Sequence, residues 1–129
     1  MNTTGPSGGL QGRRIFVVED EMMLSMMIED MLTEFGCEVV QASRISEALE
    51  LAATTAMDAA LLDVNVAGAP IDPVARELQK RGIPFVFSTG YGAGGVPADY
   101  RGWLTLSKPF QQEELQTMLE RAIAAGPAR

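Results

Sequence analysis

The 129-residue sequence predicts an α/β fold, in which one five-stranded parallel sheet carries helices on both faces. Five short runs rich in β-branched and aromatic residues alternate with segments whose apolar residues recur at helical spacing. One run, residues 59–63, is apolar until it ends in Asp63, which is typical of a strand buried on both faces. Parallel strands joined by right-handed crossovers then favour the doubly wound order 2-1-3-4-5.

The first half of the chain supplies three predicted strands and two predicted helices. Residues 15–18 form the first strand, residues 37–42 the second and residues 58–63 the third. The first helix ends at Gly36, and its buried face is expected to consist of Leu24, Met27, Ile28, Met31, Leu32 and Phe35. Ser43 is a candidate N-cap for the second helix, whose apolar face is formed by Ile45, Ala48, Leu49 and Ala52.

The second half contains an interrupted version of the same pattern. A third helix is expected to begin with Asp72 as N-cap and Pro73 at its first position, and to end at Gly82. Residues 84–89 form the fourth strand. Residues 90–102 hold five glycines and one proline, so the fourth helix is expected to be short or replaced by a glycine-rich loop. Residues 103–106 form the fifth strand, and the last helix buries Leu115, Met118, Leu119, Ala122 and Ile123.

Composition excludes several classes of function. The net charge of -7 argues against nucleic-acid binding, and the absence of histidine removes Ser/His/Asp and Cys/His catalysis and histidine metal sites. No apolar run approaches the roughly 20 residues that span a bilayer. The one cysteine, Cys37, is most simply a buried strand residue and fits the cytoplasm, where we expect the protein to be. Residues 1–12 are expected to be a flexible tail, and residues 13–126 one domain without an output domain.

Charged or hydroxyl-bearing side chains stand at or just after the ends of four of the five predicted strands. Glu19 and Asp20 follow the first strand, Asp63 ends the third, Thr89 the fourth, and Lys108 follows the fifth. In the expected strand order these ends share one crevice, so the five side chains should converge. Three carboxylates with no histidine or cysteine suit Mg²⁺, and a lysine and a hydroxyl beside them complete a site for phosphoryl transfer. Asp63, alone at the sheet centre, is the expected nucleophile.

With these residues in place, the sequence resembles a receiver domain of two-component response regulators over about residues 13–125. The resemblance rests on Glu19-Asp20, Leu61-Leu62-Asp63-Val64-Asn65, Thr89 and Lys108-Pro109-Phe110. It implies the flavodoxin-like receiver fold, with Asp63 as the phospho-acceptor. It also implies a Mg²⁺ site formed by Asp20, Asp63 and the backbone carbonyl of Asn65, with Glu19 acting through water.

The resemblance assigns roles to the remaining site residues as well. Lys108 would pair with the phosphoryl group, Thr89 would hydrogen-bond it, and the Lys108–Pro109 bond would be cis. The run Phe87-Ser88-Thr89-Gly90-Tyr91 is similar to a Phe-Ala-Thr-Gly-Tyr motif found in an often stand-alone subgroup of receivers. One departure is Thr105, where receivers carry a switch aromatic; Tyr91 and Trp103 are the candidates to replace that aromatic.

The function expected from the resemblance is a single-domain response regulator that signals by protein contacts or phosphorelay, as a monomer or weak dimer. It would not be an enzyme beyond Mg²⁺-dependent self-phosphorylation and dephosphorylation. Its donor would be a histidine kinase or a histidine phosphotransfer protein, docking at Met22 and Met26 on the first helix. The alternative is a receiver-like binding module that works without phosphorylation. A phosphohydrolase of the haloacid-dehalogenase kind is disfavoured, because that family has a second aspartate where Asn65 stands.

Overall fold

The structure is a computed structural model that describes residues 9–90 and 95–126. Its elements, in chain order, are β1 (Arg14–Val18), α1 (Met22–Glu34), β2 (Glu38–Ala42), α2 (Ile45–Thr54), β3 (Ala59–Asp63), β4 (Asn65–Val66), β5 (Ala69–Pro70), α3 (Asp72–Lys80), β6 (Phe85–Thr89), a 3₁₀ helix (Ala98–Tyr100), β7 (Thr105–Ser107) and α4 (Gln112–Ala125). The main sheet is parallel, with the order β2-β1-β3-β6-β7. The predicted strand order is therefore confirmed.

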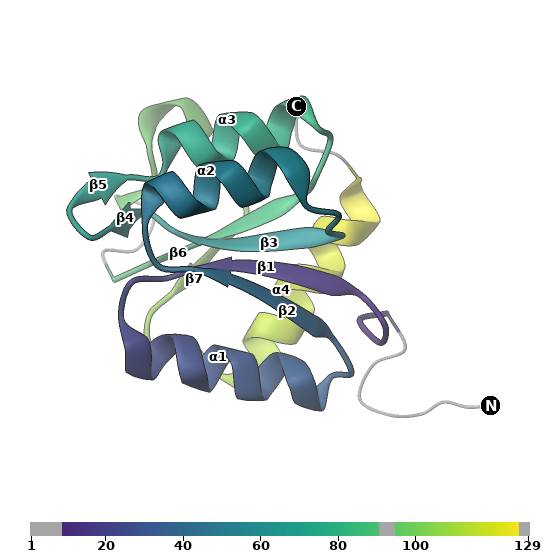
Figure 1. Cartoon of the computed structure of the whole chain (residues 1–129). Helices are drawn as coiled ribbons and strands as arrows, with labels where there is room; N and C mark the ends of the chain where they lie inside the picture. The colour runs from purple at the N-terminus through teal and green to yellow at the C-terminus, as the bar shows by residue number, and fades with distance from the viewer. Residues whose placement is uncertain (1–8, 91–94, 127–129) are drawn as a thin grey trace.

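Helices cover both faces of this sheet, as Figure 1 shows. On one face α2 and α3 bury Phe16, Leu62 and Phe87 with their neighbours, and on the other α1 and α4 bury Ile15, Leu61 and Val86 with theirs. Alternate residues of each strand thus enter opposite cores, which explains why β3 is apolar along its whole length.

A small hairpin that the sequence analysis did not predict lies immediately beyond β3. Strands β4 and β5 pair antiparallel, and the turn between them holds Ala67 at φ 53° and Gly68 at φ 84°. A positive φ costs glycine nothing, whereas alanine adopts it only under constraint. The hairpin projects at the carboxyl end of the sheet, on the left of Figure 1, where it flanks the end of β3.

Two predicted helix starts were displaced by one residue. The N-cap of α2 is Arg44, with no side-chain cap, so the prediction of Ser43 was wrong. The backbone N–H of Ser43 instead donates to Oε1 of Glu47 at 3.1 Å. Asp72 is the first residue of α3 rather than its N-cap, which is Ile71. In that first turn the carboxylate still favours the positive end of the helix dipole.

The surface of α1 differs from the prediction at one methionine. Ile28 and Leu32 are buried as expected, but Met27 is 52% exposed, so its assignment to the buried face was wrong. Met27 lies at the edge of the apolar stripe, where helical spacing alone does not decide burial.

Leu10 belongs to the folded part of the chain, although it falls within the predicted tail. Its side chain is fully buried among core residues contributed by both α1 and α4. The backbone carbonyl of Leu10 accepts a hydrogen bond from Sγ of the buried Cys37 at 3.4 Å. Ordered structure therefore extends at least to Leu10, while residues 1–8 of the predicted tail lie outside the described part.

The glycine-rich segment contains no α-helix among its described residues. It contains the 3₁₀ helix that ends at Tyr100. Tyr91, a candidate replacement for the switch aromatic, lies outside the described residues. Among the described residues, no helix combines the length and apolarity that crossing a membrane requires.

Candidate functional site

Three carboxylates meet at the carboxyl ends of β1 and β3. Glu19 and Asp20 follow β1 directly, and Asp63 is the last residue of β3. Because these strands are neighbours in the parallel sheet, their ends lie side by side. One oxygen from each carboxylate lies within 4.8 Å of the others. Glu19 and Asp63 are buried, at 3% and 7% exposure, while Asp20 faces solvent.

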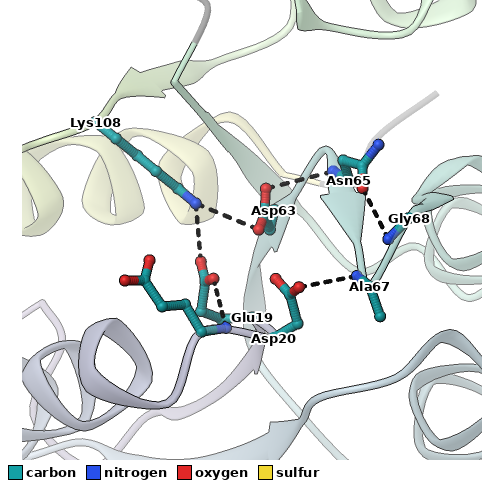
Figure 2. A network of polar contacts seen from close by, with 8 residues as sticks. Glu19, Asp20, Asp63, Asn65, Ala67, Gly68 and Lys108 are labelled. Carbon is teal, nitrogen blue, oxygen red and sulfur yellow. Dashed lines mark hydrogen bonds and ion pairs between the residues drawn. The ribbon is translucent and has the colours of Figure 1, made fainter.

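Lys108 brings a positive charge to this cluster from the loop after β7. Its Nζ lies 3.1 Å from Oε1 of Glu19 and 3.3 Å from Oδ2 of Asp63 (Figure 2). The backbone N–H of Lys108 donates to the carbonyl of Thr89 at 2.8 Å, which ties the loop to the end of β6. The peptide bond between Lys108 and Pro109 is cis, as the resemblance implied. The lysine is thus held between the two buried carboxylates.

The unpredicted hairpin supplies backbone donors to the same cluster. The N–H of Ala67 donates to Oδ2 of Asp20 at 3.0 Å, and the N–H of Gly68 donates to Oδ1 of Asn65 at 3.1 Å. The N–H of Asn65 lies 3.3 Å from Oδ1 of Asp63. Figure 2 shows how these contacts connect the hairpin to the acidic site. An asparagine followed three residues later by glycine is a turn signal, and it was available in the sequence.

The pKa values of Glu19 and Lys108 are shifted by their surroundings. Burial raises the pKa of Glu19, and the charge of Asp63 adds to this, whereas the N–H of Glu21 and Lys108 oppose it. Burial works to lower the pKa of Lys108, but the hydrogen bond to Glu19 and the charge of Asp63 outweigh it, so that this pKa lies above its ordinary value. The lysine is therefore a fixed cation at neutral pH.

Three carboxylates and one lysine leave the site with an excess negative charge when all four groups are ionised. The donor set is entirely oxygen, and one member, Asp20, is open to solvent. Mg²⁺ prefers such carboxylate oxygens and keeps several waters, which an exposed side of the site permits. The residues present therefore fit a magnesium ion.

Thr89 is fully buried at the end of β6, and its neighbour Ser88 pairs in register with Asp63. Thr105, at the position of the absent aromatic, donates its hydroxyl to the carbonyl of Trp103 at 2.9 Å. It is also paired in register with Phe87.

An aromatic cluster surrounds this part of β6. The Trp103 ring stacks on that of Phe85, with centroids 5.6 Å apart and planes 10° apart. Tyr100, which the sequence analysis did not single out, packs edge-to-face against Phe87 at 5.6 Å and against Trp103 at 4.9 Å. Its hydroxyl donates to Oε1 of Gln79 at 3.2 Å. Tyr100 was missed because it lies in a segment whose glycines gave no helical or strand pattern.

A pocket of about 350 Å³ opens beside the acidic cluster, between α1 and β2. Glu19 and Asp20 form one side of it, and the predicted docking residues Met22 and Met26 form another. These methionines are 76% and 55% exposed. The pocket thus joins the acidic site to an apolar surface on α1.

Comparisons with protein families and with known proteins agree with the fold described above. The family model of the response regulator receiver domain matches residues 15–120. The transcriptional regulatory protein PdtaR of Mycobacterium tuberculosis (strain H37Rv) is 30% identical, in an alignment covering 94% of this chain and 63% of that protein. The chain thus spans less than two thirds of that relative.

Two solved structures are similar to the chain along nearly their whole lengths. SdrG from Sphingomonas melonis Fr1 is 36% identical, with a TM-score of 0.74 over 92% of this chain and 98% of that one. The receiver domain of the sensor histidine kinase PA1611 from Pseudomonas aeruginosa PAO1 is 28% identical, with a TM-score of 0.74 over 88% and 98%. That domain was solved with a magnesium ion in its active-site cleft.

Proposed function

The chain belongs to the response regulator receiver domain family, and on that premise we propose that it accepts a phosphoryl group on Asp63 from a histidine kinase or a histidine phosphotransfer protein. The observation that carries the proposal is the position of Lys108. Its Nζ lies within 3.3 Å of both Asp63 and Glu19, at the one described cluster of three carboxylates. The lysine cation can bind the oxygens of a tetrahedral phosphate, while the carboxylate beside it attacks the phosphorus.

In the transfer, a carboxylate oxygen of Asp63 attacks the phosphorus of a phosphohistidine. The new O–P bond forms as the P–N bond breaks, and the donor's imidazole leaves with the electron pair and takes up a proton. Lys108 balances the charge of the phosphoryl oxygens throughout, because its ammonium already lies beside the attacking group. The exposed side of the cluster, at Asp20, leaves room for the donor to approach.

Asp20, Asp63 and the backbone carbonyl of Asn65 would hold Mg²⁺, with Glu19 contributing through water. When bound, the ion would neutralise charge on the transferring phosphoryl oxygens. Asp20 is held toward the cluster by the N–H of Ala67, so the hairpin orients this proposed ligand. Glu19 is held by the N–H of Glu21 and by Lys108.

The phosphorylated state would differ from the free state in charge and in hydrogen bonding. A phosphoryl group adds about -1.5 to -2 charges and three acceptor oxygens. Lys108 and the hydroxyl of Thr89 would satisfy these acceptors. Because the carbonyl of Thr89 also accepts a hydrogen bond from the N–H of Lys108, movement of one residue displaces the other. The segment between β6 and β7 would carry the signal to a partner.

The docking surface for the donor would include Met22 and Met26, which line the pocket beside the acidic site. Exposed methionines form adaptable apolar contacts. Changing both to serine should slow phosphotransfer from a protein donor and leave phosphorylation by acetyl phosphate unchanged. Equal slowing with both donors would contradict this role.

The direct test is the intact mass after incubation with acetyl phosphate and Mg²⁺. We expect one added phosphoryl group, absent in Asp63→Asn and absent when EDTA removes the metal. Asp99→Asn, at an exposed position in the 3₁₀ helix, is the matched control and should be labelled like the original protein. Absence of label on the unaltered protein, with acetyl phosphate and with a phosphorylated histidine phosphotransfer protein, would favour the phosphorylation-independent binding module instead.

A further inference from the structure

The outward face of α1 is divided along its length into two chemically different halves. Its first two turns expose Met22, Met23, Met26 and Met27, at 76%, 70%, 55% and 52%. We call these four residues the methionine patch. Its last two turns expose three acids, which we call the acidic patch: Glu29, Asp30 and Glu34. The helix contains no lysine or arginine.

Helical geometry places both patches on the same side of α1. Several residues of the two patches are related by spacings of three, four or seven, and Met23, Met26, Asp30 and Glu34 lie opposite the buried Ile28 and Leu32. Met22, Met27 and Glu29 lie at the flanks of this outward face. The centres of the patches are separated by about seven residues, which corresponds to about 10 Å along the axis. Figure 1 shows α1 running from the end of the sheet that carries the acidic site to the opposite end. The methionine patch is therefore the half nearer to Asp63.

From this arrangement we propose the chemistry of the partner that docks on α1, an inference that rests on the proposed function. The partner carries a helix with apolar side chains near its phosphohistidine, and lysine or arginine about two turns farther along. The apolar side chains cover the methionine patch, and the basic side chains face Glu29, Asp30 and Glu34.

Charge complementarity selects this occupant over an apolar or acidic one. A purely apolar helix would bury the three carboxylates of the acidic patch without a compensating positive charge, and an acidic helix would add like-charge repulsion. A basic partner is also attracted at a distance by a chain whose net charge is -7. Docking in the reverse direction would set basic groups on methionines and apolar groups on carboxylates. The two patches thus fix the direction of docking as well as the partner.

The test uses two synthetic helices of identical composition, each hydrocarbon-stapled because short free helices are marginal in water. In the segregated peptide, one face carries leucines in its first two turns and lysines in its last two. In the mixed peptide, the same leucines and lysines alternate along that face. Binding is measured by NMR titration of the backbone amides, at low and at high salt. We expect the segregated peptide to bind several-fold more tightly and to shift the amides of α1.

Two triple variants separate the acidic patch from net charge. Glu29→Gln/Asp30→Asn/Glu34→Gln removes the patch, and Glu50→Gln/Asp99→Asn/Glu113→Gln removes three exposed acids elsewhere. We expect the first triple to weaken binding of the segregated peptide about tenfold at low salt and less at high salt, as three exposed ion pairs would. The second triple should leave binding within about twofold.

Three outcomes would overturn the proposal. They are equal affinity of the two peptides, equal weakening of peptide binding in the two triple variants, and amide shifts that lie outside α1 and leave the amides of α1 unchanged. Phosphorylation by acetyl phosphate, measured on the same variants, is expected to be unchanged. Loss of peptide binding with intact phosphorylation would refute the partner chemistry alone. Failure of phosphorylation with intact selective peptide binding would refute the proposed function alone.

Discussion

Neutralising one member of the acidic cluster should make the metal-free protein more stable and should reduce the stabilisation that magnesium provides. We choose Asp20→Asn, because Asp20 is exposed and the asparagine fills the same volume. The asparagine carbonyl can still accept the hydrogen bond from the N–H of Ala67, now 3.0 Å from Oδ2. The substitution therefore removes charge with little change in packing.

The expected gain can be worked out from the separation of the carboxylates. At the 4.8 Å limit of the cluster, two like charges repel by about 0.9 kcal/mol at the dielectric constant of water and by about 3.5 kcal/mol at an effective value of about 20. Asp20 is exposed, so the lower value applies. It repels both Glu19 and Asp63, and attraction to Lys108 offsets about one of these terms. Weakening the hydrogen bond removes roughly 0.5 kcal/mol.

The net expectation is a gain of about 0.5 kcal/mol, which raises Tm by about 2 °C for a chain of this size. Urea unfolding without metal measures this gain. In saturating Mg²⁺ the original protein should gain about 2.7 kcal/mol at a concentration 100 times the dissociation constant, whereas Asp20→Asn should gain much less. Asp99→Asn is the control and should keep the full magnesium effect. Destabilisation of Asp20→Asn without metal, or equal magnesium effects, would refute the reasoning.

Three further predictions concern the core and its edges. Burial, with a smaller contribution from the charge of Asp58, raises the pKa of Cys37 to about 11, so the thiol should react with DTNB at neutral pH only after unfolding. In the unfolded chain the thiol has its ordinary pKa of 9.0 and loses its proton at lower pH than in the folded protein. The free energy of unfolding should therefore fall as pH rises from 9 to 11, by up to about 2.7 kcal/mol. The variant Cys37→Ala should lack this part of the decline. Leu10→Ala should lower the free energy of unfolding by about 2–3 kcal/mol in urea, since Leu10 is fully buried, and a change within 0.5 kcal/mol would contradict its role in the core. Tyr100→Phe should lower the free energy of unfolding by about 1 kcal/mol, because it removes the hydrogen bond to Gln79. A matching decrease in Gln79→Ala, with no further decrease in the double variant, would show that this bond is the cause.

The strand order and the carboxyl ends of the first four strands of the main sheet were predictable from the sequence pattern. The fifth strand, predicted over residues 103–106, is β7 at Thr105–Ser107. The apolar run that ends in Asp63 is typical of a buried strand, and the carboxyl end of such a strand lies at the ligand edge of a parallel sheet. Once that order is fixed, the convergence of Glu19, Asp63 and Lys108 follows from topology. In the structure, Nζ of Lys108 lies within 3.3 Å of a carboxylate oxygen of both Glu19 and Asp63.

The features that were missed depend on contacts between distant segments. The hairpin that holds Asp20 in place is only two residues a side, too short for an alternating pattern. Leu10 lies in a glycine-rich stretch, and only the space between α1 and α4 shows that it is buried. Met27 sits at the margin of an apolar stripe, where the neighbouring elements decide exposure. Such positions are decided by tertiary packing rather than by local sequence.

The central claim is that Asp63 is the residue that carries the phosphoryl group. It is tested most directly by phosphorylating the protein with acetyl phosphate, reducing the acyl phosphate with borohydride, and mapping the reduced residue by peptide mass spectrometry. The account predicts that homoserine replaces aspartate at position 63, and that no reduced residue is found in Asp63→Asn. Reduction at Glu19 or Asp20 in the unaltered protein, or at no carboxylate in a protein whose intact mass shows the added group, would contradict it.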